Sequence, residues 1–288
     1  MRTLYREFET QAQIDAQYNP SLSLAADDNP MLHYARTAER ARAQLHGVLD
    51  IHFGPTLAET LDIFPASQPN APVFIFLHGG YWRALSSKDF SGIALGLHAQ
   101  GITTVVVNYA LCPVVTIDEI VRQCRAACAW VFRHIAEHGG DPARVAIGGH
   151  SAGGQLTAMC LQTPWERDYG LPADPFAAAV LVSGLYDLVP LRYSYLQPMI
   201  QLDEGTVARN SPVLHGRKSM TPIWLTWGGA ETSEFARQSQ IFHDAWLAQG
   251  NQAQLQAQPG ANHFTAIHGF EEPHSTLCRW LAGHLGTD

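Results

Sequence analysis

Short apolar runs and longer amphipathic segments alternate along most of the chain. Residues 73–77 (VFIFL) and 103–107 (TTVVV) are short uncharged runs, typical of strands that other elements cover on both faces. Longer segments place apolar residues three or four positions apart, which predicts helices packed against such strands. Further strands are predicted at residues 145–148, 178–182, 222–227 and 252–258, and helices at residues 30–45, 90–100, 116–138, 155–162 and 234–249 and from about residue 273 to the end.

A change of period comes before this alternation. Residues 48–53 and 59–64 alternate apolar and polar side chains around a turn that contains Gly54-Pro55, which predicts a half-buried hairpin. A hairpin followed by repeated strand–helix units predicts an α/β fold. We expect a mostly parallel central sheet with an N-terminal antiparallel hairpin and helices on both faces.

Two stretches depart from the alternation. Residues 1–46 are polar apart from one helical pattern, and we interpret them as a helical arm, or cap, laid over the core. Residues 185–220 hold many aromatics and prolines, and we interpret them as a short cap insertion over the top of the sheet. No repeat or linker divides the chain, so one domain over residues 1–288 is expected.

Charge and composition narrow the classes of partner. Lys and Arg number 18 against 26 Asp and Glu, a net charge of −8, without a basic run that would neutralise a line of phosphates. We therefore expect no nucleic-acid partner. Residues 1–10 lack an apolar leader, and no run reaches the roughly 18 apolar residues of a membrane span, so we expect no membrane partner and a cytoplasmic location. The five cysteines fit no CxxC spacing and mostly lie in apolar segments, which predicts buried free thiols.

The pentapeptide at residues 149–153, Gly-His-Ser-Ala-Gly, lies between a predicted strand and a predicted helix. Glycines on both sides of the serine permit the sharp turn that raises a nucleophile at the carboxyl edge of a sheet. We therefore expect Ser151 to be a nucleophile. A glycine-rich turn used only for tight packing is the alternative.

A serine hydroxyl needs a base to take its proton and an acid to orient that base. The base should follow the last strand, and His263 occupies that position, with His268 as the near competitor among 14 histidines. His134 and His138, four residues apart, could hold a metal, but their place near a helix end favours an interaction with the helix dipole. No metal site is therefore predicted.

Three carboxylates compete for the role of the orienting acid. Glu231 is the first carboxylate after the strand predicted at 222–227, and it is favoured. Glu234 lies one helical turn later, where a carboxylate also stabilises the start of a helix. Asp187 follows the preceding strand.

Hydrolysis through a tetrahedral intermediate also needs N–H donors for the developing oxyanion. The sequence His78-Gly79-Gly80 directly follows the strand predicted at 73–77. We expect the backbone N–H groups of Gly79, Gly80 and Ala152 to form the oxyanion hole, with His78 buried and structural.

These motifs together resemble a known family. The strand followed by HGGYW, the GHSAG turn, an acid followed by EFARQS, and NHF resemble the α/β-hydrolase fold, and within it the arylformamidase (kynurenine formamidase) group close to the hormone-sensitive-lipase-like esterases. The HGGxW form is similar to the formamidases, whereas those esterases tend to carry HGGG or HGGA. The resemblance also covers Asn108-Tyr109 and runs from about Tyr18 to the carboxyl end. It implies Ser151 as nucleophile, His263 as base and Glu231 as acid, although the acid in eukaryotic members of the family is usually Asp.

The resemblance implies hydrolysis of N-formyl-L-kynurenine to kynurenine and formate, a step of tryptophan breakdown, through an acyl-enzyme and without a metal or organic cofactor. The expected substrate-binding residues are the aromatics Tyr81, Trp82, Tyr193 and Tyr195, with core packing as the alternative for Trp82. A carboxylesterase acting on short-acyl or aryl esters is the alternative function, because it would use the same catalytic residues. A non-catalytic binding protein is disfavoured because the serine, the acid and the histidine are all retained. No feature demands an oligomer, and a homodimer stays open.

Overall fold

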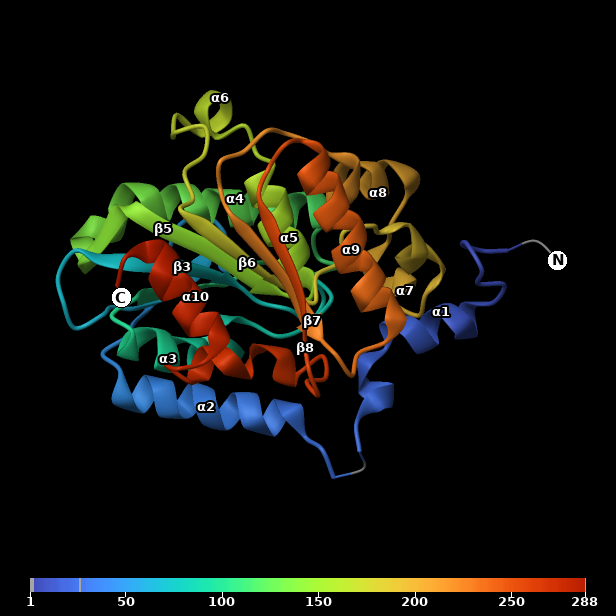
Figure 1. The fold of residues 1–288 in the computed structure, drawn as a ribbon, viewed down its shortest axis with the longest axis horizontal. Helices are drawn as coiled ribbons and strands as arrows, with labels where there is room; N and C mark the ends of the chain where they lie inside the picture. The colour runs from blue at the N-terminus through green and yellow to red at the C-terminus, as the bar shows by residue number, and fades with distance from the viewer. Residues whose placement is uncertain (1–2, 26, 288) are drawn as a thin grey trace.

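The computed structural model describes residues 3–25 and 27–287. Residues 1, 2 and 288, at the ends of the expected domain, and residue 26 of the expected arm lie outside the described residues. The described chain forms an eight-stranded sheet in the order β1-β2-β4-β3-β5-β6-β7-β8 (Figure 1). The strands are β1 (Val48–His52), β2 (Thr60–Phe64), β3 (Ala71–Leu77), β4 (Thr103–Val107), β5 (Gly140–His150), β6 (Ala178–Val182), β7 (Ile223–Gly228) and β8 (Ala253–Gln258).

The direction of the strands confirms the expected mixed sheet. β2 pairs antiparallel with β1 and with β4, and the remaining neighbours are parallel. The predicted hairpin forms, but its burial differs from the expectation of two half-buried strands. All of β2 is buried because it lies between β1 and β4, whereas β1 is mostly exposed because it is an edge strand. The parallel strands align their carboxyl ends along one edge of the sheet, where their following loops meet.

Helices cover both faces of the sheet (Figure 1). Along β3, Val73, Ile75 and Leu77 join a core that also contains side chains of α4, α5 and α9. Phe74 and Phe76 point to the opposite face and join a core with side chains of α2, α3 and α10. The helices are α1 (Gln11–Tyr18), α2 (Pro30–Gln44), α3 (Ala94–Ala99), α4 (Ile117–His134), α5 (Ala152–Leu161), α6 (Trp165–Tyr169), α7 (Gln197–Ile200), α8 (Glu204–Asn210), α9 (Ser233–Ala248) and α10 (Thr276–Leu285).

The expected arm reaches both sides of the molecule. α1 buries Ile14 and Tyr18 in the core that includes α9, while α2 buries Tyr34 in the core on the other face. α1 lies near α7 and α9, and α2 runs beneath α3 (Figure 1). The sequence predicted α2 but not α1, and the helix predicted at 90–100 is divided between the 3-10 helix η2 (Ser87–Ile93) and α3. The segment that links the two arm helices passes the carboxyl edge of the sheet.

All five cysteines are buried and free, in agreement with the expectation from their spacing. None of the described helices combines the length and the apolar character that crossing a membrane requires.

Candidate active site

Ser151 occupies the turn between the end of β5 and the start of α5. Its backbone lies in a sparsely populated region, with φ 57° and ψ −120°, a conformation that costs a non-glycine residue energy and recurs at functional sites. The two flanking glycines make this turn possible. A Cβ atom at Gly149 would lie 2.2 Å from the carbonyl oxygen of Gly153, and one at Gly153 would lie 1.9 Å from that of Leu77. The strand–turn–helix geometry expected from the GxSxG motif is therefore present.

His263 and Glu231 are in contact, from the loops that follow β8 and β7. The Nδ1 atom of His263 lies 2.6 Å from Oε2 of Glu231, and both side chains are almost completely buried. The other carboxylate oxygen, Oε1, accepts hydrogen bonds from the backbone N–H of Gly228 at 2.6 Å and the hydroxyl of Ser183 at 2.5 Å. Three donors therefore hold the carboxylate, and its contact to Nδ1 leaves Nε2 of His263 as the free ring nitrogen.

The other two candidate acids face different partners. Glu234 is buried, accepts a hydrogen bond from the hydroxyl of Tyr18 and pairs with Arg237 at 2.7 Å. Asp187 accepts a hydrogen bond from the hydroxyl of Tyr5. Among the three carboxylates weighed from sequence, only Glu231 contacts His263 in the described chain.

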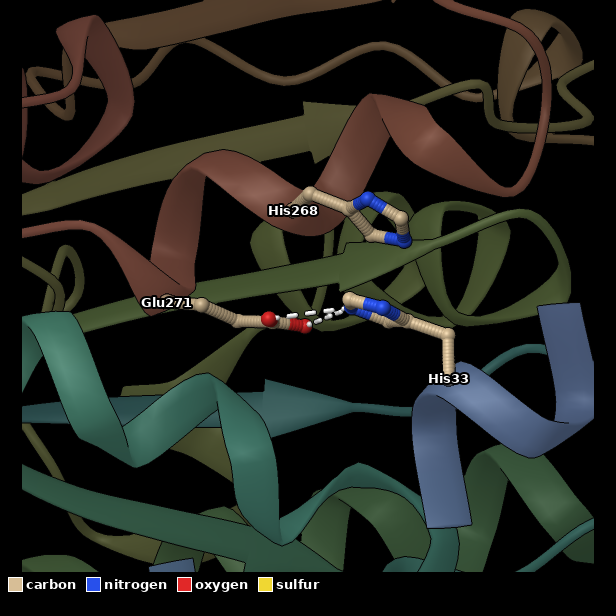
Figure 2. A group of neighbouring side chains, drawn as sticks. All are labelled: His33, His268 and Glu271. Atoms are coloured by element: carbon tan, nitrogen blue, oxygen red, sulfur yellow. Dashed lines mark hydrogen bonds and ion pairs between the residues drawn. The ribbon is translucent and has the colours of Figure 1, made fainter. Parts of the chain in front are cut away.

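His268, the competing base, belongs to a cluster with His33 of α2 and Glu271 (Figure 2). Nε2 of His33 lies 3.0 Å from both carboxylate oxygens of Glu271, and the two imidazole rings stack with centroids 3.9 Å apart. One donor atom from each of the three residues lies within 4.8 Å of the others, as a metal site would need. The planes of the two stacked rings are inclined by 22° to each other. The cluster joins α2 to the segment that follows His263.

The helical pair His134 and His138 packs against Trp130. The ring centroids lie 4.9 Å and 5.9 Å from that of Trp130, and Nδ1 of His134 lies 3.1 Å from the carboxylate of Glu137. Their surroundings agree with a structural role near the end of α4.

Gly79 and Gly80 follow β3 beside the serine turn. A Cβ atom at Gly79 would lie 3.2 Å from Cβ of Ser151, so the two backbones approach closely. Neither glycine donates its N–H to an acceptor within the described residues. Ala152 is the first residue of α5, where a backbone N–H has no acceptor within the helix. The three N–H groups predicted for the oxyanion hole therefore lie on segments that flank Ser151 and remain available.

Two of the four predicted substrate-binding aromatics line the same cavity as Ser151. They are Tyr81 and Tyr195. Trp82 is fully buried and donates its indole N–H to Oε1 of Gln155 at 3.0 Å. This residue therefore packs in the core, which was the alternative to substrate binding. Tyr193 is half-buried and packs near Arg192, outside the residues that line the cavity.

The cavity has a volume of about 420 Å³. Its walls include Gly79, Gly80, Ser151 and His263. The segment between α1 and α2, with the first residue of α2, adds Asn19, Pro20, Ser21, Leu24, Asp28, Asn29 and Pro30. Sequence reasoning placed an arm over the core but did not single out these residues. A signal was present, because Asn19-Pro20 and Asn29-Pro30 are turn and helix-start dipeptides that bring the chain back over the sheet.

Two further histidines, His78 and His150, are buried beside the site. His78 is fully buried between Tyr109 and Phe90, and burial lowers its pKa to about 4. The Nε2–H of His150 donates a hydrogen bond to the backbone oxygen of His263 at 2.8 Å, because a carbonyl oxygen can only accept. Burial and the nearby His263 hold the pKa of His150 well below its usual range. A neutral His150 thus fixes the backbone of His263.

A mixed sheet, a serine at a strained strand-to-helix turn and a histidine held by a carboxylate define the alpha/beta hydrolase class. The chain matches the family model of the alpha/beta hydrolase fold over residues 74–266, more than half of its 288 residues, and it belongs to that family.

Named relatives refine the comparison. Kynurenine formamidases of Danio rerio and Salmo salar are 29% and 30% identical to this chain, and the alignments cover 95% of this chain and 96% of each relative. A crystal structure from Silicibacter sp. TM1040, provisionally named a thioesterase, has a TM-score of 0.80 and 26% identity. It covers 93% of this chain and 98% of its own.

Proposed function

We propose that this alpha/beta hydrolase cleaves an aryl formamide, N-formyl-L-kynurenine, to kynurenine and formate. The observation that carries the proposal is the contact of His263 with Glu231 beside the Ser151 turn, in a chain whose full-length relatives include kynurenine formamidases. The HGGYW segment at residues 78–82 supports the same substrate class.

In the proposed reaction, the hydroxyl oxygen of Ser151 attacks the formyl carbon while Nε2 of His263 takes the hydroxyl proton. Glu231 stabilises the imidazolium that forms. The N–H groups of Gly79, Gly80 and Ala152 stabilise the negative charge on the former carbonyl oxygen, at typically about 3 kcal/mol of barrier for each donor.

Collapse of this intermediate breaks the bond between carbon and the aryl nitrogen, which receives the proton from His263 and leaves as the free arylamine. A formyl ester on Ser151 remains. Water then attacks this ester, with His263 taking one proton of the water, and formate leaves as Ser151 regains its hydrogen.

Parallel rate measurements on a formamide and an ester test the proposal. We expect kcat/KM for N-formyl-L-kynurenine above about 10⁴ M⁻¹s⁻¹, within the range of working enzymes, and slower cleavage of p-nitrophenyl acetate. Ser151→Ala should lower kcat at least about 10⁴-fold while the protein stays folded by circular dichroism. Ser233→Ala is the matched control. This serine lies at the start of α9, and its exposed hydroxyl has Gln17 as its hydrogen-bond partner among the described residues.

Each outcome has a separate meaning. Rapid ester cleavage with negligible release of formate would contradict the formamidase and favour the carboxylesterase alternative. Turnover of Ser151→Ala at the rate of the wild-type protein would contradict the nucleophile assignment itself.

A further inference from the structure

Two formally charged side chains, one positive and one negative, line the cavity beside Ser151 among the described residues, if its two histidines are left aside. They are Arg83 and Asp28. Apolar and neutral polar side chains make up the rest of the lining, including Leu24, Met31 and Phe90. A small-molecule site of this type obtains its specificity from a few polar groups set in an apolar wall.

Arg83 has an unusual environment for a cation. It is half-buried, two residues beyond Tyr81 in the same segment as Gly79 and Gly80. No carboxylate of the described chain lies within 4.0 Å of its guanidinium group, which stands 5.8 Å from the centroid of the Tyr195 ring. A cation that has lost part of its hydration and has no anionic partner favours an anionic ligand, and a guanidinium group matches a carboxylate with two parallel hydrogen bonds.

Asp28 comes from the segment that links α1 and α2. One of its oxygens accepts the backbone N–H of Ala25 at 3.2 Å, and no Lys or Arg of the described residues lies within 4.0 Å. The carboxylate is exposed at its edge of the cavity, so it is available to an ammonium group.

We propose that this cavity recognises the zwitterionic amino-acid group of its substrate, with Arg83 binding the α-carboxylate and Asp28 the α-ammonium group. The inference rests on the proposed function, in which a formamide is the group that reacts at Ser151. In N-formyl-L-kynurenine the amino-acid group is attached through a short chain to the ring position next to the formamide. With the aryl ring beside Tyr195, the carboxylate of the amino-acid group would therefore reach the adjacent Arg83 while the formyl group reaches Ser151.

Two formamides that differ in the amino-acid group provide the test. N-formyl-L-kynurenine has this group, and formanilide lacks it. We expect Arg83→Gln to lower kcat/KM for N-formyl-L-kynurenine by about 10- to 100-fold, the scale of a hydrogen-bonded charged pair, and to change the value for formanilide less than about twofold. Asp28→Asn should lower kcat/KM for N-formyl-L-kynurenine by about threefold, because an exposed ion pair contributes less. Arg279→Gln, on the exposed side of α10, is the control and should change neither value.

A binding measurement separates this inference from the proposed reaction. Calorimetry would measure L-kynurenine binding to Ser151→Ala and to the double variant Ser151→Ala/Arg83→Gln. A Kd at least about tenfold weaker in the double variant supports the inference even if the wild-type protein cleaves neither formamide, an outcome that would reject only the proposed reaction. Equal binding by both variants, no binding by either, or an equal loss of kcat/KM for both formamides would overturn the inference.

Discussion

Glu231 shows how a single side chain is fixed at the residue scale. Its side chain turns back toward its own strand, so that Oε1 accepts the N–H of Gly228 three residues earlier while Oε2 holds His263. An aspartate is one methylene shorter and would have to give up one of these contacts. These two contacts give a geometric reason for a glutamate rather than an aspartate at this position.

Replacing this carboxylate tests its role. Glu231→Gln keeps the size of the side chain but loses the negative charge that stabilises a protonated His263, so kcat should fall by about 10⁴-fold. Glu231→Asp should retain more activity than Glu231→Gln, because it keeps the charge. Steady-state kinetics measure both, with the exposed Glu272→Gln as control. Equal kcat for Glu231→Gln and the wild-type protein would exclude Glu231 as the acid.

The sequence predicted Ser151, His263 and Glu231 as site residues because each follows a strand that its own apolar pattern predicts. It did not identify Ser183, which donates to Glu231 across 48 residues of sequence. Nothing local distinguishes this serine, since its role depends on how the loops after β6 and β7 meet. Likewise, Trp82 follows two glycines as a binding residue would, but its partner Gln155 is known only once α5 packs beside it.

At the element scale, β5 and α5 meet β3 with no room between their backbones. A Cβ atom at Gly153 would lie 1.9 Å from the carbonyl oxygen of Leu77 and 2.7 Å from that of His78. Both contacts are to backbone, which cannot move aside as a flexible side chain can. The glycine of the motif therefore fixes the distance between the serine turn and the segment that holds Gly79.

This close approach predicts that a side chain at Gly153 destabilises the fold. Gly153→Ala should lower the free energy of unfolding by at least about 3 kcal/mol or prevent folding, because overpacking of this size forces a backbone shift. Gly250→Ala is the matched control. It has open space around its Cβ position and a φ of +76°, so it should cost only about 1 to 2 kcal/mol. Urea unfolding measures both, and similar losses for the two variants would contradict this reading of the turn.

The arm helices differ in how far their sequences specify them. Asn29-Pro30 and a clear apolar stripe predict α2, whereas α1 buries only Ile14 and Tyr18, too few apolar positions for a visible period. The stability of α1 comes from distant contacts. The hydroxyl of Tyr18 donates to Glu234 and accepts from Gln238 at 3.0 Å, and its backbone oxygen accepts the hydroxyl of Tyr81 at 2.5 Å.

Removing one hydroxyl tests the docking of α1. Tyr18→Phe removes one hydrogen bond from the buried Glu234 and one from the buried Gln238, and should lower the free energy of unfolding by about 1 to 3 kcal/mol. It should also raise KM, since Asn19 and Pro20 line the cavity directly after this residue. Urea unfolding and kinetics measure the two effects. Tyr169→Phe, half-buried and without a hydroxyl partner among the described residues, is the control, and an equal loss in both variants would contradict the role of the Tyr18 hydroxyl.

At the scale of the whole molecule, buried neutral histidines connect stability to pH. Burial lowers the pKa of His78 to about 4, and burial with the nearby His33 lowers that of His268 to about 4. In the unfolded chain each titrates near 6.5. Between these values the unfolded chain binds more protons than the folded one, so protonation favours unfolding.

The free energy of unfolding should therefore be greatest above about pH 7 and should fall as the pH drops from about 6.5 toward 4, with His78 alone contributing up to about 3 kcal/mol. Urea unfolding at pH 7.5, 6 and 5 measures this slope. His268→Asn should show a shallower slope than the wild-type protein. A slope for His268→Asn as steep as that of the wild-type protein would contradict the contribution of His268.

The two arm helices dock on segments that the ribosome makes much later than the arm itself. Tyr18 and Glu234 are 216 residues apart in sequence, and His33 and Glu271 are 238 apart. Contacts of such high contact order form late, after loop closure over most of the chain. Ser151 is synthesised before either of these partner segments, so the arm cannot close the cavity around the serine turn until Glu234 and Glu271 have been made. Loss of the segment that carries Glu271 would therefore leave α2 without part of its support, far along the sequence from the helix itself.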